Sequence, residues 1–255
     1  MRNDDAVSQV SDDLVLAEDG DGVRLLTLNR PDTLNALSWP LLDAIRAALQ
    51  AAADDDEVRC VALTGSGRAF TAGSDISGSS KDMEDPWQPF ISRVETFPKP
   101  LVVAVNGLAV GFGTTILCHC DLSLAGASAR FKMPFASLGL VPEVGSTFSL
   151  PGLMGRYAAT HAFLTGGWIS SEDALAQGLV WRTTSDEELL AETWAVCREI
   201  AAAPLESVVN TKRLLLDARL PDTYAARMRE EPIFTRLQSG PAHLAALAKF
   251  QEKRK

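Results

Sequence analysis

Two strand-like runs in the first half of the chain, Val58–Thr64 and Leu101–Val105, each lead directly into a glycine-rich segment. The second run is apolar at every position, which is typical of a parallel strand buried on both faces of its sheet. Ser38 is a good N-cap for a helix that ends near Asp54–Asp56, and a further helix is predicted around Ile91–Phe97. Because strands and helices alternate, the sequence predicts an α/β fold with a mainly parallel sheet.

Shorter signals predict the remaining elements. Leu14–Glu18 and Val23–Leu28 flank Asp19-Gly20-Asp21-Gly22, which favours a β-hairpin. Thr114–Cys120 has the pattern of a buried helix and Asp121–Ala125 that of the next strand. From about residue 151 the pattern is mainly helical, with helices predicted at Tyr157–Leu164, Ser171–Gln177, Asp186–Ala203, Leu205–Arg219, Thr223–Ser239 and Ala242–Gln251, and a short strand at Val180–Trp181.

Charge and composition exclude several classes of partner. The 255 residues include 24 Lys and Arg against 33 Asp and Glu, a formal net charge of −9. An acidic chain repels nucleic-acid backbones, and no apolar run is long enough to span a bilayer, so neither nucleic acid nor a membrane is an expected partner.

The cysteines and the first residues indicate the compartment. Cys118 and Cys120 flank the single residue His119, a spacing that common zinc sites do not use, so no metal is expected. Four cysteines in a chain of this size do not form a disulfide framework, which favours a reducing compartment. The polar residues 1–12 are expected to be flexible and lack the apolar core of a secretory signal. We therefore expect a cytoplasmic protein.

The two glycine-rich segments, residues 64–76 and 105–113, do not match the common phosphate-binding loops. Neither has the Gly-Lys-Ser/Thr of a Walker loop, and Gly111-Phe112-Gly113 lacks the third glycine of the dinucleotide fingerprint. Taken singly, each is best interpreted as a tight turn. Together, at the ends of neighbouring parallel strands, they can aim two backbone N–H groups at one point, as in an oxyanion hole. The second turn also opens a helix, whose N-terminal dipole favours negative charge.

A series of short motifs runs along the chain. They are Arg30-Pro31, Asn35-Ala36-Leu37, Phe70-x-Ala72-Gly73-x-Asp75, Pro98-Lys99-Pro100, Asn106-Gly107-x-Ala109-x-Gly111, and Asp121 five residues before Gly126. From about Leu14 onward, their order and spacing resemble the enoyl-CoA hydratase/isomerase (crotonase) superfamily. The resemblance implies an α/β fold, a crotonase (ClpP-like) spiral of ββα units, with residues 13–200 as the acyl-CoA-binding core. Residues 201–255 would form a helical region that mediates trimerisation and covers the active site.

The resemblance also implies the ligand and the groups that bind it. An acyl-CoA thioester would be the substrate, with no separate cofactor, and the backbone N–H groups of Ser74 and Phe112 would hold its thioester oxygen. Arg68 lies where the family has a lysine and could meet a CoA phosphate, although a solvated surface arginine is an equally good interpretation. Arg30 is better explained as a support for the Pro31 turn. The residues implied to bind substrate are Leu34, Ala36, Arg68, Ala72, Gly73, Ser74, Asp75, Ile76, Gly111, Phe112, Phe135 and Leu140.

Hydratases of this superfamily use two glutamates, and both of their positions lack a carboxylate here. The positions correspond to Thr115 and Phe135, neither of which can hold and deprotonate a water. Pro142-Glu143 resembles the Pro-Glu-Gly segment of the peroxisomal-type Δ3,Δ2-enoyl-CoA isomerases, in which the glutamate is the catalytic base. Val144 replaces the glycine of that segment and could narrow the pocket.

Glu143 has two interpretations. A glutamate after a proline is otherwise most often a solvated loop acid. In this context Leu140, Val141 and Phe135 predict apolar surroundings, which would raise the carboxyl pKa towards the working pH.

These observations favour an isomerase that converts a 3-enoyl-CoA into a 2-enoyl-CoA in fatty-acid β-oxidation. Two alternatives stay open: another acyl-CoA reaction of the superfamily, such as hydration or thioester hydrolysis, and a non-catalytic acyl-CoA-binding scaffold. The C-terminal helices are apolar on more than one face, at Leu214–Leu216 and Leu244–Leu247, so a homotrimer or a dimer of trimers is expected.

Overall fold

A computed structural model describes residues 13–75 and 85–252, so the expected flexible residues 1–12 and the expected ligand contact Ile76 lie outside the described residues. The main sheet has six strands in the order β1-β2-β3-β5-β7-β10. Their bounds are Val15–Gly20, Val23–Leu28, Cys60–Gly65, Leu101–Val105, Leu122–Gly126 and Arg182–Thr184. β1 and β2 are antiparallel, and the other pairs are parallel. The predicted hairpin is confirmed, and Asp21 and Gly22 at its tip both have positive φ, as a type I′ turn requires.

A second sheet of four short strands lies beside the main one, in the order β4-β6-β8-β9. Its strands are Ala69–Thr71, Leu108–Val110, Arg130–Lys132 and Trp168–Ser170. β4, β6 and β8 each follow one strand of the main sheet directly, so the chain passes back and forth between the two sheets. Residues 106–113 were predicted to form a turn alone. That description was incomplete, because a three-residue strand is too short to show a hydrophobic period.

The strand Leu101–Val105 is buried on both faces, as predicted, and so is its neighbour β3. Leu26, Val61 and Val103 point into the larger core, which helix α1 (Trp39–Asp54) covers. Leu25, Ala62 and Val102, one residue away from each of these, point to the opposite face under helix α7 (Leu189–Ala202). The side-chain alternation of a strand therefore divides one apolar run between two cores.

Helices lie before and after the two glycine-rich turns and hold these turns in place. α1 begins where predicted, with the Ser38 hydroxyl accepting a hydrogen bond from the Leu41 N–H at 3.4 Å. α2 (Trp87–Glu95) ends before the predicted limit at Phe97. The predicted buried helix over Thr114–Cys120 is a short α-helix, α3 (Phe112–Thr115), that continues as the 3-10 turn η2 (Ile116–His119).

The C-terminal part is helical, as predicted, but with different limits. Its remaining helices are α4 (Ser146–Met154), α5 (Arg156–Thr165), α6 (Ser171–Ala176), α8 (Leu205–Gln238) and α9 (Pro241–Glu252). α4 was not predicted, since it contains Pro151 and Gly152. The short strand expected at Val180–Trp181 is instead β10, at Arg182–Thr184.

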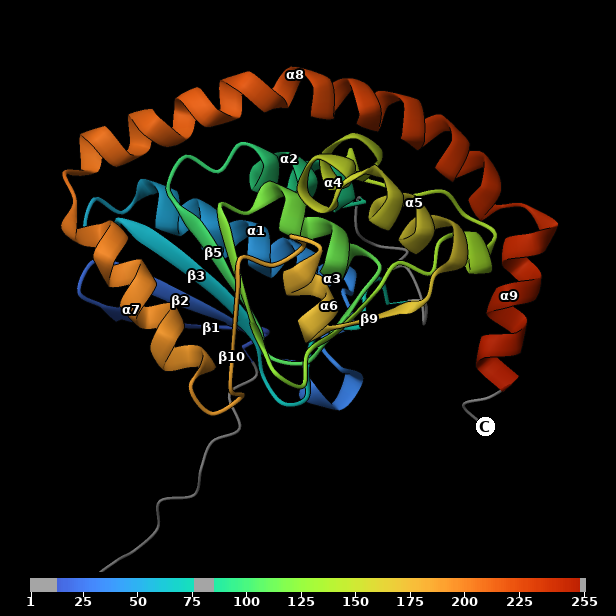
Figure 1. Ribbon diagram of the computed structural model, residues 1–255, viewed down its shortest axis with the longest axis horizontal. Helices are drawn as coiled ribbons and strands as arrows, with labels where there is room; N and C mark the ends of the chain where they lie inside the picture. Colours follow the sequence, from blue (N-terminus) through green and yellow to red (C-terminus); the bar gives the residue numbers. More distant parts are fainter. Residues whose placement is uncertain (1–12, 76–84, 253–255) are drawn as a thin grey trace, which may run out of the picture.

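The predicted break between residues 219 and 223 was wrong, because α8 is one helix of 34 residues that includes Pro221 and Pro232. Figure 1 shows α8 arching over α2, α4 and α5. Lys212 and Leu216 before Pro221, and Thr223, Arg227 and Glu230 after it, are buried against the core. Tertiary contacts on both sides of Pro221 therefore support the continuous helix. Across residues 13–75 and 85–252, no helix is long and apolar enough to cross a membrane.

Candidate active site

The two predicted glycine turns lie directly against each other. Gly73 has φ +84°, and a Cβ atom at this position would lie 2.6 Å from the carbonyl oxygen of Val110. A Cβ atom on Gly113 would lie 2.7 Å from the Thr71 side chain and 2.9 Å from its carbonyl oxygen. Since contacts this short are not tolerated, glycine at both positions is what allows the two backbones to meet.

The backbone N–H of Ser74 points away from the adjacent segment of the chain, which contains Leu37. The Leu37 N–H donates to the Gly73 carbonyl at 2.8 Å, and the Asp75 N–H donates to the Leu37 carbonyl at 3.1 Å, so these bonds bracket Ser74 in a parallel bridge. In such a bridge the bracketed residue directs its own N–H to the other side. None of the backbone hydrogen bonds found among the described residues uses the Ser74 N–H.

Phe112 presents its N–H in a similar way, at the first position of α3. Gly111 precedes it with φ +57° and ψ −118°, a conformation available essentially to glycine alone. The Gly111 N–H donates to the Lys132 carbonyl at 2.8 Å, and the Gly111 carbonyl accepts from Thr114 and Thr115. Within the described part of the chain no backbone acceptor is recorded for the Phe112 N–H. Each turn thus has one N–H group without a backbone acceptor among the described residues, which is what an oxyanion hole would require.

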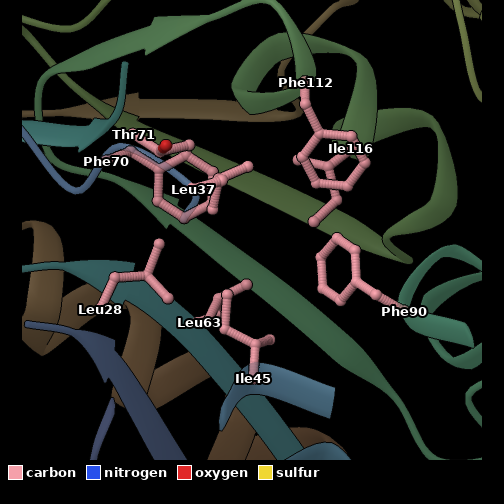
Figure 2. Close-up of a pocket in the computed structure, with 9 residues that line it drawn as sticks. All are labelled: Leu28, Leu37, Ile45, Leu63, Phe70, Thr71, Phe90, Phe112 and Ile116. Carbon is pink, nitrogen blue, oxygen red and sulfur yellow. The ribbon is translucent and has the colours of Figure 1, made fainter. Parts of the chain in front are cut away.

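Aromatic packing fixes the Phe112 backbone from behind. Its ring is 3% exposed and meets the rings of Trp87 and Phe90 on α2, with centroids 5.5 Å and 5.3 Å away. Figure 2 shows Phe112, Phe90 and Phe70 around a small apolar cavity. The cavity volume is about 10 Å³, room for about one water, so this space cannot hold an acyl chain. The residues around it pack behind the two turns that carry the Ser74 and Phe112 N–H groups, called the donor turns below.

Glu143 lies on a constrained turn between η3 (Ala136–Leu138) and α4. The next residue, Val144, is buried and has φ +56°, an uncommon conformation for a β-branched residue. The Val144 carbonyl accepts a hydrogen bond from His119 Nε2 at 2.8 Å. Burial lowers the pKa of His119 to about 4, so the imidazole is neutral and its single proton lies on Nε2. Because His119 ends the segment that begins at Phe112, this bond ties the Glu143 turn to the Phe112 turn.

The long helix α8 holds the same turn from the other side. The Gly145 N–H donates to Glu230 Oε2 at 2.7 Å, and the Thr147 N–H donates to Glu230 Oε1 at 2.9 Å. The Thr147 hydroxyl also donates to Oε1. Neither Glu230 nor His119 was predicted to have a role at the site, because neither residue belongs to a recognisable motif.

The Glu143 carboxyl has a strongly raised pKa. Burial, followed by the negative charge of Glu230, raises its pKa to about 8. Glu143 is half-buried and keeps some contact with solvent. Leu140 and Phe135, two of its predicted apolar neighbours, pack in or against the same core as Phe112.

The two residues at the positions of the hydratase glutamates, Thr115 and Phe135, are both buried. The Thr115 side chain is fully buried, and its hydroxyl donates to the carbonyls of Gly111 and Phe112. Phe135 is 4% exposed and belongs to the larger core. Neither position carries a carboxylate towards a bound substrate.

The predicted CoA-binding loops are brought together. The Ala72 N–H donates to the Leu34 carbonyl at 2.9 Å, so the Leu34–Ala36 loop lies along the first donor turn. Arg30 Nη1 donates to the Ala36 carbonyl at 2.6 Å and pairs with Asp75 at 3.1 Å, in keeping with its predicted supporting role. Arg68 is exposed. Across the described ranges, no group of three or more His, Cys, Asp or Glu side chains is placed to hold a metal ion.

Comparison with known proteins agrees with this geometry. Residues 18–255 match the enoyl-CoA hydratase/isomerase family. The chain belongs to this family. It is 35% identical to 1,2-epoxyphenylacetyl-CoA isomerase of Escherichia coli over 203 residues, 75% of this chain and 78% of that protein. It is 33% identical to enoyl-CoA delta isomerase 2 of Rattus norvegicus over 221 residues, 83% of this chain and 56% of that protein.

The fold of the family is shown by its solved structures. An enoyl-CoA hydratase/isomerase from Pseudoalteromonas atlantica superposes with a TM-score of 0.90 at 35% identity, covering 95% of this chain and 98% of that one. The predicted crotonase fold is therefore confirmed. Other relatives of this chain are named probable enoyl-CoA hydratases. Membership of the family therefore does not by itself decide between isomerisation and hydration.

Proposed function

We propose that this family member converts a 3-enoyl-CoA into a 2-enoyl-CoA, with Glu143 as the single proton carrier. The observation that carries the proposal is the distribution of acids around the donor turns. Thr115 and Phe135 replace the two hydratase glutamates, whereas Glu143 is half-buried and has a carboxyl pKa of about 8. A reaction that moves one proton between two carbons needs one such group, and hydration needs more.

The chemistry follows from the position of the C2 proton, which lies between the thioester carbonyl and the C3=C4 double bond. The Glu143 carboxylate takes this proton, and the electron pair of the C–H bond passes into a dienolate with charge on the thioester oxygen. The N–H groups of Ser74 and Phe112 stabilise that oxygen, and one such donor is typically worth about 3–4 kcal/mol. Protonated Glu143 then returns the proton to C4, and the double bond forms between C2 and C3. The equation is balanced without water, metal or an electron carrier.

The product fits fatty-acid oxidation, since a 2-enoyl-CoA is the form that a hydratase accepts. The proposal is tested by the rates of two reactions with the same purified protein: isomerisation of 3-hexenoyl-CoA and hydration of crotonyl-CoA. We expect isomerisation to be faster by at least about 100-fold, the usual contribution of a positioned general base. Equal rates would favour a hydratase, and binding of acyl-CoA without either reaction would favour the scaffold.

A further inference from the structure

We infer that Glu230 on helix α8 is a positioning residue for Glu143, acting through the turn that carries it. This inference rests on the proposed role of Glu143 as the proton carrier. Glu230 is 87 residues away in the sequence and lies in a helix without catalytic motifs. Its carboxylate nevertheless makes hydrogen bonds to the two residues that determine the direction of the Glu143 turn.

The contacts of Glu230 surround the start of α4. Oε2 accepts from the Gly145 N–H at 2.7 Å, and Oε1 accepts from the Thr147 N–H at 2.9 Å and from the Thr147 hydroxyl. The side chain is buried, at 5% exposure. Hydrogen bonds from N–H groups to an ionised acceptor are stronger than neutral ones. The carboxylate therefore fixes the backbone two and four residues after Glu143.

The turn also needs an external restraint. Val144 has φ +56°, and a β-branched residue keeps this conformation only where its surroundings impose it. His119 holds the Val144 carbonyl on one side, and Thr223 of α8 packs on the other, where a Cβ atom on Gly145 would lie 2.6 Å from its carbonyl oxygen. The hydrogen bonds that Glu230 accepts from Gly145 and Thr147 add a further restraint from α8.

The charge of Glu230 adds a second effect. The nearby cation on α8, Arg227, forms an ion pair with Glu95 of α2 at 2.7 Å and a longer one with Glu231 at 3.5 Å. Arg227 is thus engaged with other carboxylates, and Glu230 is balanced mainly by the N–H groups it accepts from. A negative charge beside Glu143 favours its protonated form and raises its pKa.

Other ionisable groups lie around this cluster, among them Arg219 of α8, whose charge acts on His119 and Cys118. Neutral His119 and the buried thiol of Cys118 face it from η2, and Glu95 faces it from α2 with a pKa raised to about 7 by burial. Of these groups, Glu95 titrates in the same range as Glu143. Its titration must therefore be separated from that of Glu143 in any pH experiment.

The test uses Glu230→Gln, with Glu231→Gln as the matched control. The glutamine keeps the size of the side chain but removes the charge and cannot accept the bonds from both Gly145 and Thr147. Glu231 is the next residue on α8, pairs with Arg227 and accepts a hydrogen bond from Gln88, without touching the Glu143 turn. Carboxyl titration by NMR after ¹³C-glutamate labelling, with Glu143 identified by the signal lost in Glu143→Gln, measures the pKa without substrate. The Glu95 signal is identified in the same way from Glu95→Gln.

We expect Glu230→Gln to lower the pKa of Glu143 by about one unit. We also expect kcat for 3-hexenoyl-CoA, compared at pH 9.5 where Glu143 is ionised in both proteins, to fall by roughly 10-fold with little change in KM, since misplaced reacting groups lose rate rather than binding. Glu231→Gln should leave both values as in the wild type. An unchanged Glu143 pKa and kcat in Glu230→Gln would overturn the inference. A wild-type protein that does not isomerise would instead overturn the proposed function, and the NMR titration would still report on Glu230.

If Glu230→Gln does not fold, Thr147→Val decides the positioning role. Thr147 is exposed, and the valine removes one donor to Glu230 while the charge stays in place. We expect kcat to fall several-fold with the Glu143 pKa unchanged. Wild-type kcat in Thr147→Val would then contradict the inference.

Discussion

At the scale of single residues, the pKa of Glu143 leads to a prediction about pH. A base with a pKa of about 8 is about one-tenth ionised at pH 7, so kcat/KM should rise about tenfold per pH unit below pH 7 and level off above pH 8. The sign follows because only the carboxylate can take the C2 proton. The measurement is kcat/KM for 3-hexenoyl-CoA between pH 5.5 and 9.5. A profile that levels off near pH 5 would mean that Glu143 is an ordinary solvated acid.

The residues of the site were predicted to different degrees, for physical reasons. Ser74 and Phe112 could be found because glycine turns leave a local pattern, and Glu143 because it follows a proline in a recognisable segment. Glu230 and His119 act through single long-range hydrogen bonds, at 2.7 Å and 2.8 Å. A bond of this kind leaves no periodicity or spacing in the sequence, so only the folded structure reveals it.

At the scale of elements, the contact between the donor turns predicts that Gly73→Ala is damaging. The new methyl group would lie 2.6 Å from the Val110 carbonyl at φ +84°, so the turns must separate and the two N–H groups no longer converge. We expect a loss of at least about 100-fold in kcat, comparable to the loss of one oxyanion donor.

Gly152→Ala is the matched control, because Gly152 lies within α4 and its Cβ atom would meet nothing within 4 Å. This variant should keep wild-type activity and gain about 0.5–1 kcal/mol in the free energy of unfolding. Chemical denaturation measures the free energy of unfolding of both variants, and kcat for 3-hexenoyl-CoA measures their activity. Full activity in Gly73→Ala would show that the close approach of the turns is not required.

The elements themselves show which parts of a fold a sequence reveals. β1, β2, β3, β5, β7 and α1 were predicted, since each is long enough to show a pattern and α1 has a local cap at Ser38. The three-residue strand β10 was expected at Val180–Trp181 and lies at Arg182–Thr184. β4, β6, β8 and β9 have three residues each, too few for a pattern. α8 continues through Pro221 because the buried residues Thr223 and Arg227 dock it onto the core, an effect of tertiary structure that overrides the local signal.

At the scale of the whole molecule, the exposed apolar side chains predict self-association. Tyr157 and Leu164 on α5 are 81% and 71% exposed, and Leu214 and Leu215 on α8 are 71% and 61% exposed. Large apolar residues gathered on helices are typical of subunit interfaces. We propose a homotrimer or a dimer of trimers. Light scattering at micromolar concentration should give a mass of three or six times 27.4 kDa, and a monomer would contradict the proposal.

In the proposed reaction one carboxylate carries the proton, and the Glu143→Gln variant is the decisive test of this role. The measurement is kcat and KM for 3-hexenoyl-CoA beside the wild type. Glutamine keeps the shape of the side chain but cannot accept the C2 proton, whereas the donor turns that bind the thioester are backbone features elsewhere. We predict that kcat falls by about 100- to 10,000-fold while KM changes little. A kcat within a few-fold of the wild type would contradict the account and would mean that another acid, such as Asp75, Glu84 or Glu95, moves the proton.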